Sequence, residues 1–300
     1  MVFRGNLLLV ALAAGCAAGQ PGVVDVTADF LARACPAAAG EPFARAWLEH
    51  ERRNWRVYGP LYYPEGEPGR AAAARERGAR RDDLCKQTRA FAVAAPALLQ
   101  ALRPRVARLI GARPRARAIL SAPVIGSDGR TLLLDGEVVL ALNATAETYA
   151  RLNGTVVTLT HELVHDAQKA RWAAELARLP PLAASLYSEG GAVFAMTLLY
   201  PETGDRATGL APEKLAAVDR AAAAADLLAE IDGADAPPRF FGGGDKVGYV
   251  LGLAVLRELA RRIGDLPALQ LSPAEFLRQA RPILARMATA RTASPAPRAR

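Results

Sequence analysis

Histidine and cysteine are scarce in this chain of 300 residues, which contains three of each. Two of the histidines, His161 and His165, stand four positions apart, so only His50 is left to complete a site with three histidine ligands. His50 lies in a highly charged segment, where we expect an exposed helical residue. The low count therefore disfavours a metal site with three histidines. It also disfavours a cysteine nucleophile, because only His50 is left to activate one.

Lysine and aromatic residues are scarce as well: only four of the 38 basic residues are lysines, and aromatic residues make up 6% of the chain. The net charge of +8 is diffuse, and no module of interleaved basic and aromatic residues is evident. We therefore expect solvated helix faces and no nucleic-acid partner, with weak attraction to anionic membranes or envelope polymers as the alternative. The hydrophobic content of 51% is typical of a folded, alanine-rich helical protein.

The apolar run near the N-terminus, Leu7–Ala14, is too short to span a bilayer. Small residues follow it, so residues 1–19 are predicted to be a signal peptide. The segment Leu12–Cys16 resembles a bacterial lipobox, although its leucine is one place further from Cys16 than usual. Two forms remain open: a lipoprotein anchored to a membrane through Cys16, and a soluble protein cleaved near Gly19. Both predict export, to the bacterial periplasm, the outer membrane or the medium.

Cys35 and Cys85 remain in the exported chain, and two cysteines in an oxidising compartment suggest a disulfide. The bond would tie two N-terminal helices together across a loop of about 50 residues and add roughly 2–4 kcal/mol of stability. The alternative is a pair of buried free thiols.

The motif H-E-x-x-H occupies residues 161–165, as His-Glu-Leu-Val-His. Residues four apart share one face of an α-helix, so His161 and His165 can bind one metal ion together. Glu162 lies near that face and can take a proton from a metal-bound water. Asn153, Gly154 and Thr155 provide a helix start. The alternative is a solvated helix with an incidental histidine pair.

Glu189 is the candidate for a third ligand, since a catalytic zinc usually has three protein ligands and a water. It is the only charged residue between Leu179 and Pro201. A lone carboxylate in an apolar helix needs a compensating cation, which zinc would supply. The alternative is a structural glutamate that is protonated or paired with an arginine. Carboxylates that we expect to be solvated are weaker candidates: Asp166, Glu175 and Glu202.

The H-E-L-V-H motif followed by Glu189, 24 positions after His165, resembles the gluzincins, the thermolysin-like clan of zinc peptidases. It is more closely similar to bacterial families of predicted zinc proteases. These add an E-G helix and a downstream G-Y-x-x-G segment, here Gly248–Gly252. The likeness covers roughly residues 118–262. In one respect the chain departs from thermolysin: Val193 stands where a carboxylate should follow the ligand glutamate by four positions.

The resemblance implies a zinc peptidase acting on peptides or proteins, and the N-terminal leader implies its export. His161, His165 and Glu189 would hold one zinc ion, and Glu162 would be the general base. Tyr249, between two glycines, is the candidate donor to an oxyanion, with a core tyrosine as the alternative and Tyr187 as a poorer choice. The rival interpretation is a non-catalytic zinc-binding protein of the cell envelope.

We expect an α+β fold that is mostly α. Residues 20–115 are predicted to form a helical region, residues 116–288 a zincin-like domain with a small β-sheet or hairpin, and residues 289–300 a disordered tail. By the resemblance, the strand Glu137–Asn143 should lie at the sheet edge, where it would pair with an extended substrate.

The pattern of apolar residues and turn signals predicts the individual elements. Strands are expected at Ala118–Ile125, Thr131–Leu134 and Val138–Leu142. Helices are expected at Thr27–Cys35, Pro42–Tyr58, Arg70–Ile110 (divided by Pro96 and Pro104), Ala211–Ile231, Val247–Ile263 and Ser272–Ala288, beside the two that carry the metal ligands.

Overall fold

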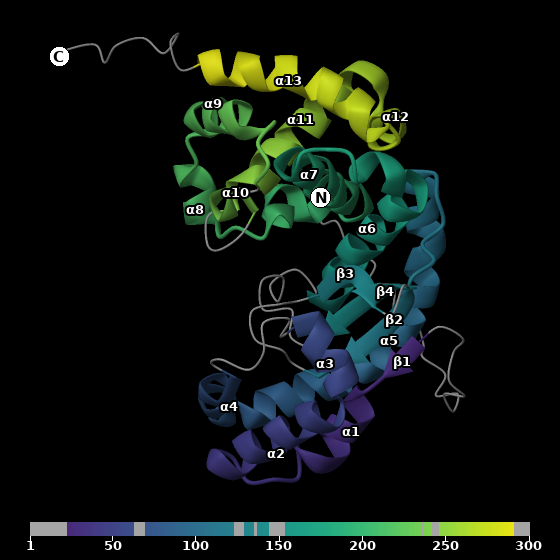
Figure 1. The fold of residues 1–300 in the computed structure, drawn as a ribbon, viewed down its shortest axis with the longest axis vertical. Coiled ribbons are helices and arrows are strands. Elements are labelled where there is room, and N and C mark those ends of the chain that lie inside the picture. Colours follow the sequence, from purple (N-terminus) through teal and green to yellow (C-terminus); the bar gives the residue numbers. More distant parts are fainter. Residues whose placement is uncertain are drawn as a thin grey trace, which may run out of the picture.

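The computed structural model describes residues 23–62, 70–122, 129–134, 137–143, 154–235, 237–241 and 246–290. The fold is α+β and mostly α, as the composition predicts. One small sheet lies between two groups of helices, with the N-terminal group at one end of the molecule and the C-terminal group at the other (Figure 1). The proposed leader with Cys16 and the tail from residue 291 lie outside the described residues.

The first group of helices precedes most of the sheet. It consists of α1 (Thr27–Arg33), α2 (Glu41–Arg53), α3 (Trp55–Tyr62), α4 (Arg70–Gly78) and α5 (Arg81–Ile110). The second group follows the sheet. It consists of α6 (Gly154–Leu176), α7 (Pro181–Leu199), the 3-10 helix η2 (Pro201–Thr208), α8 (Pro212–Ala217), α9 (Arg220–Glu230), α10 (Pro238–Phe241), α11 (Val247–Ile263), α12 (Asp265–Leu269) and α13 (Pro273–Thr289).

The sheet has the strand order β1-β2-β4-β3. Strands β1 (Val23–Asp25), β2 (Arg117–Ser121) and β4 (Glu137–Asn143) are parallel, whereas β3 (Gly129–Leu134) pairs antiparallel with β4. The three strands expected from the sequence are therefore present, and β1 joins them from the N-terminal region.

The expectation that Glu137–Asn143 forms the sheet edge is wrong. β4 pairs with β2 on one side, with Ile119 opposite Ala141, and with β3 on the other, with Leu132 opposite Val139. The reason is its apolar character on both faces: Val139, Leu140 and Leu142 are all fully buried. A strand that is buried on both faces is typical of the interior of a parallel sheet. The edge strand that contacts helix α6 is β3 instead.

Helix α5 is continuous, although Pro96 and Pro104 were expected to divide it. Its buried residues recur every three or four positions along the full length of 30 residues, so one apolar stripe packs through both prolines. That burial outweighs the hydrogen bonds that the prolines cannot donate. The stripe consists of Leu84, Cys85, Thr88, Phe91, Ala95, Leu99, Leu102, Val106 and Ile110. α5 consequently reaches from the N-terminal helices to the C-terminal ones (Figure 1).

Three segments that were each expected to form one helix form two helices in the structure. The segment 42–58 breaks at Asn54, and the segment 70–110 breaks before Arg81. The segment 211–231 breaks at Asp219, whose carboxylate accepts hydrogen bonds from the backbone N–H groups of Ala221 and Ala222. An aspartate that caps the helix following it starts a new helix at that point.

A small core in the N-terminal group surrounds the cysteine pair. The Sγ atoms of Cys35 and Cys85 are 2.11 Å apart and form a disulfide between the end of α1 and helix α5. Phe30, Phe43 and Trp47 pack edge to face around it. The predicted pairing of the two cysteines is therefore present, and it fastens α1 to α5.

His50 is fully buried in this region, so the expectation of an exposed residue is wrong. Its Nδ1 lies 2.7 Å from Asp29 Oδ2 and its Nε2 lies 2.8 Å from the Tyr58 hydroxyl. Because both ring nitrogens have hydrogen-bond partners, the imidazole can be buried. Its sequence neighbours Arg52 and Arg53 are exposed. Burial lowers the pKa of His50 in spite of Asp29. His50 is thus a structural residue.

Candidate metal centre

Helix α6 carries the H-E-x-x-H motif into the core. It begins at Gly154, as expected, and His161 and Glu162 are 6% and 7% exposed. Apolar residues buried against the main core surround them, including Leu163 and Val164. The motif is therefore part of a buried helix, and the alternative of a solvated helix with an incidental histidine pair does not hold.

Helix α7 brings Glu189 to the two histidines. The helix begins at Pro181, and it is apolar enough to pass as a membrane span by length and composition, yet 61% of its most apolar window is buried inside the fold. It packs against α6 and α11 as a core helix. Glu189 is its charged residue, and it faces α6.

Three ligand atoms form a compact triangle at this point. His161 Nε2 lies 3.0 Å from Glu189 Oε2, His165 Nε2 lies 2.9 Å from His161 Nε2, and His165 Nε2 lies 3.4 Å from Glu189 Oε2. Within the described residues, this is the only group of three or more histidine, cysteine, aspartate or glutamate side chains placed to share a metal ion. Glu175 and Glu202 do not join it.

The triangle fits a tetrahedral zinc ion. Zinc bonds of about 2.0–2.1 Å at tetrahedral angles separate neighbouring ligand atoms by roughly 3.3 Å. The observed separations of 2.9 to 3.4 Å need only small side-chain adjustments to reach that value. Two imidazole nitrogens and one carboxylate oxygen are also the protein ligands of a common class of catalytic zinc, which leaves the fourth position open to water. The cluster can therefore hold a metal ion.

Charges within the triangle favour this use. Desolvation by itself would lower the pKa of His165, but the negative charges of Glu189 and Glu162 raise it to about 9. Desolvation would likewise raise the pKa of Glu189, yet the two histidines hold it well below its ordinary value. Among the described residues, the basic groups in contact with Glu189 are the histidines. Glu189 is thus an ionised carboxylate that attracts a cation, rather than a protonated or arginine-paired glutamate.

Gln168 contacts one of the candidate ligands, and no motif in the sequence marks it. Its Oε1 lies 3.3 Å from His165 Nδ1, so the Nδ1–H can donate to the amide and leave Nε2 with its lone pair toward the triangle. Gly191 makes room for this amide, because a Cβ there would lie 2.4 Å from Gln168 Nε2. Only its position three residues after His165, on the same helix face, could have suggested this role.

The E-G segment and the G-Y-x-x-G segment contact each other through one glycine of each, Gly190 and Gly252. A Cβ on Gly252 would lie 2.6 Å from the Cα of Gly190, so α7 and α11 touch backbone to backbone. This contact sets the depth at which Glu189, next to Gly190, approaches the histidines. The first turn of α11 carries Tyr249, whose ring lies near His161.

Tyr249 lies next to the triangle, with its ring centroid 6.4 Å from that of His161. It is partly buried between Phe241, whose ring centroid is 5.5 Å away, and Lys246, whose ammonium lies 5.8 Å from the ring centre. Tyr187 is differently placed: its hydroxyl donates to the Leu271 carbonyl at 3.1 Å, and burial raises its pKa. Of the two tyrosines considered from the sequence, Tyr249 is the one that faces the ligands.

Asp166 is buried, with 2% exposure, and the expectation of a solvated residue is wrong. Its Oδ2 accepts a hydrogen bond from the backbone N–H of Ala116 at 2.8 Å. This bond joins α6 to the start of β2. On α6, Asp166 directly follows the candidate ligand His165. Burial raises the pKa of Asp166, which the backbone hydrogen bonds partly oppose. Its role is therefore to hold α6 in place.

No protein-family model, curated protein or solved structure matches this chain.

Proposed function

We propose that this chain is an exported zinc peptidase that hydrolyses peptide bonds. The observation that carries the proposal is the buried triangle of His161, His165 and Glu189 with the carboxylate of Glu162 on the same helix turn. A purely structural metal site has no need of an additional carboxylate beside its ligands. The zincin-like identity of the fold is part of the same proposal.

A zinc ion held by the three ligands would supply an acidified water and a positive charge for the substrate carbonyl. Glu162 then acts as the general base: its carboxylate takes the proton of the attacking water and delivers it to the leaving amine. Glu162 stands three positions before His165 on α6, within one turn of the same helix. Gln168 keeps His165 in the tautomer that binds through Nε2.

Tyr249 is the donor that we assign to the oxyanion of the tetrahedral intermediate. Its ring centroid lies 6.4 Å from that of His161, and the residue stands in the first turn of α11. A peptide main chain would pair with the edge strand β3, which contacts α6. Edge pairing holds an extended peptide through main-chain hydrogen bonds, which are the same whatever side chains the substrate carries.

Export agrees with the disulfide between Cys35 and Cys85, since such bonds persist in oxidising compartments. The lipoprotein and soluble secreted forms both satisfy this proposal, and the mass of the mature N-terminus distinguishes them.

The test compares the wild type with Glu162→Gln in two measurements: bound zinc by atomic absorption, and cleavage of a peptide library followed by mass spectrometry. We expect both proteins to bind one zinc ion and only the wild type to cleave. Glu175→Gln, on the same helix but outside the triangle, is the matched control and should cleave like the wild type. If zinc binds and the wild type cleaves no peptide, the protein is the non-catalytic alternative.

A further inference from the structure

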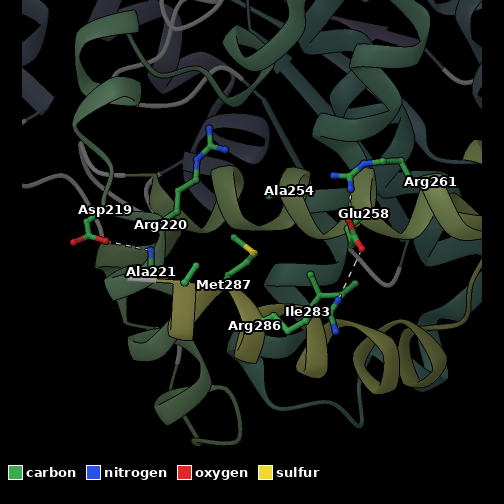
Figure 2. Close-up of a pocket in the computed structure, with 10 residues that line it drawn as sticks. Asp219, Arg220, Ala221, Ala254, Glu258, Arg261, Ile283, Arg286 and Met287 are labelled. Carbon is green, nitrogen blue, oxygen red and sulfur yellow. Dashed lines mark hydrogen bonds and ion pairs between the residues drawn. The ribbon is translucent and has the colours of Figure 1, made fainter. Parts of the chain in front are cut away.

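Helix α11 borders two regions where charged side chains gather. Its later turns, together with α9 and α13, line a pocket of about 640 Å³ (Figure 2). Arg220 and Arg286 lie on opposite sides of that pocket. Each guanidinium is turned to a different carboxylate, Asp205 or Glu258, so these arginines serve contacts within the fold. The start of α11 is the other region, and it lies near the candidate metal ligands.

Lys246 stands at the start of α11 in an unusual backbone conformation. Its φ of 45° and ψ of 26° are in the left-handed region, which no other non-glycine residue of the described chain adopts. This region is costly for a residue that has a Cβ. Lysine also has no oxygen atom with which to cap the helix, and Lys246 makes no side-chain capping hydrogen bond. Neither backbone preference nor helix capping therefore explains a lysine at this position.

The ammonium group of Lys246 lies next to the tyrosine that faces the metal ligands. Its Nζ is 5.8 Å from the ring centroid of Tyr249, which in turn is 6.4 Å from the ring centroid of His161. Phe241 packs against the tyrosine ring with the centroids 5.5 Å apart, and Gly248 admits the Phe241 ring because it has no Cβ to overlap it. Lys246 thus places a positive charge beside the residue that we assign to the oxyanion.

This positive charge is not needed to balance the metal centre. The double positive charge of a zinc ion would be offset by the carboxylates of Glu162 and Glu189, one negative charge each. Lys246 is half-buried, so its ammonium group is partly desolvated and still within reach of a group that arrives from solvent. A charge in such a position attracts a carboxylate more strongly than a fully exposed one does.

From this arrangement we propose that Lys246 selects the substrate, by binding the carboxylate of a glutamate or aspartate side chain next to the scissile bond. Successive residues of an extended peptide are about 3.3–3.6 Å apart. That spacing suits a peptide whose scissile carbonyl lies at Tyr249 and whose neighbouring side chain reaches the ammonium group, 5.8 Å from the tyrosine ring. The inference rests on the proposed hydrolysis and names its substrate class. Lys246 is a specificity residue and takes no part in bond breaking.

The test measures binding, so that it does not depend on turnover. Zinc-loaded Glu162→Gln is titrated by calorimetry with peptides that are blocked at both ends and differ in a single residue, glutamate or glutamine, placed at each position in turn. We expect the best glutamate peptide to bind about five- to ten-fold more tightly than its glutamine counterpart. This preference should disappear when Lys246→Met is added, because the methionine keeps the length of the side chain and removes its charge.

Three further variants separate charge from structure. Lys246→Arg keeps the positive charge and should keep most of the preference. Lys246→Gly suits a left-handed backbone, so it should be at least as stable as the parent protein in urea denaturation and should still lose the preference. Lys86→Met removes an exposed lysine of α5 and should change neither stability nor binding.

Equal binding of the glutamate and glutamine peptides, or a preference that survives in Lys246→Met, overturns the inference. The same peptides with a free C-terminus form a second series. A preference that depends on Lys246 only in that series also overturns it, because the carboxylate recognised is then the chain end. If the wild type cleaves peptides but no acidic preference is found, the hydrolysis stands and this inference fails. A preference that depends on Lys246, without any cleavage by the wild type, supports the binding role and removes the hydrolysis.

Discussion

Gly190 and Gly252 meet at the crossing of α7 and α11, where a Cβ on Gly190 would lie 2.9 Å from the Cα of Gly252. The contact joins two segments that are far apart in the sequence. Glu189 precedes one of these glycines and Tyr249 precedes the other by one helical turn, so the same crossing positions a metal ligand and the assigned oxyanion donor.

Replacing Gly252 with alanine should therefore destabilise the protein and displace Glu189. The new Cβ would meet backbone atoms of α7, which cannot move aside as a flexible side chain can. We expect a loss of about 1–3 kcal/mol in the free energy of unfolding, measured by urea denaturation. Gly248→Ala is the comparison: the atoms nearest to its Cβ belong to the side-chain ring of Phe241, which can move aside, so this variant should cost less. Equal effects of the two variants would argue against a tight helix crossing.

Gln168→Ala should weaken zinc binding by about 10–100-fold, because His165 loses the acceptor that fixes its tautomer. A competition titration with a zinc chelator measures the affinity, and nitrogen-15 NMR of the histidines reports the tautomer. Gln168→Glu, which keeps an oxygen acceptor, should bind more tightly than Gln168→Ala. Gln100→Ala, at an exposed position on α5, is the control. Unchanged affinity and tautomer in Gln168→Ala would remove Gln168 from the site.

Glu189→Ala should reduce zinc affinity far more than any change of a neighbouring carboxylate, because two histidines alone rarely hold a catalytic zinc. Calorimetric titration with zinc measures the loss. Glu202→Ala, just after α7 and outside the triangle, should bind zinc like the wild type. Wild-type affinity in Glu189→Ala would show that the third ligand is a different residue.

Zinc affinity should increase with pH up to about 9. With a pKa raised to about 9, His165 is protonated at neutral pH in the metal-free protein, and it must lose that proton to bind zinc through Nε2. We expect up to about a ten-fold gain in affinity per pH unit between pH 7 and the pKa. Calorimetry in two buffers with different ionisation enthalpies counts the released proton. A pH-independent affinity over this range would mean that His165 is neutral before zinc binds.

The same proton has a consequence for the metal-free fold. The folded-state pKa of His165 lies above the value of about 6.5 for an unperturbed histidine. The ion pair with Glu189 therefore contributes stability that is fully present below about pH 6.5 and is lost as the pH rises through about 9.

Much of the site could be predicted from the sequence because its elements are local. The four-residue spacing of His161 and His165 places them on one helix face whatever the rest of the chain does. The isolation of Glu189 in an apolar segment marks it as a buried charge that needs a cation. The bounds of α11 are those expected from its apolar periodicity. Cys35 and Cys85 are the two cysteines that follow the predicted leader, so each had one possible partner.

Other features depended on contacts between distant segments. His50 and Asp166 read as solvated residues in charged surroundings, but Asp29, Tyr58 and the Ala116 backbone satisfy their hydrogen bonds and bring them into the core. The prolines of α5 predicted breaks in the helix. The helix is continuous because its apolar stripe packs against other elements along its whole length.

The sequence by itself determined the residues of the candidate metal centre: the two histidines, the glutamate between them and a single apolar-embedded carboxylate, since helix geometry and burial energies act within one segment. Tertiary structure alone decided how these groups meet. The crossing of Gly190 with Gly252 sets the distance of Glu189 from the histidines, Gln168 beside Gly191 fixes the tautomer of His165, and pairing on both sides makes β4 an interior strand. Each of these results from steric fit between segments whose separation in the sequence carries no information about their contact.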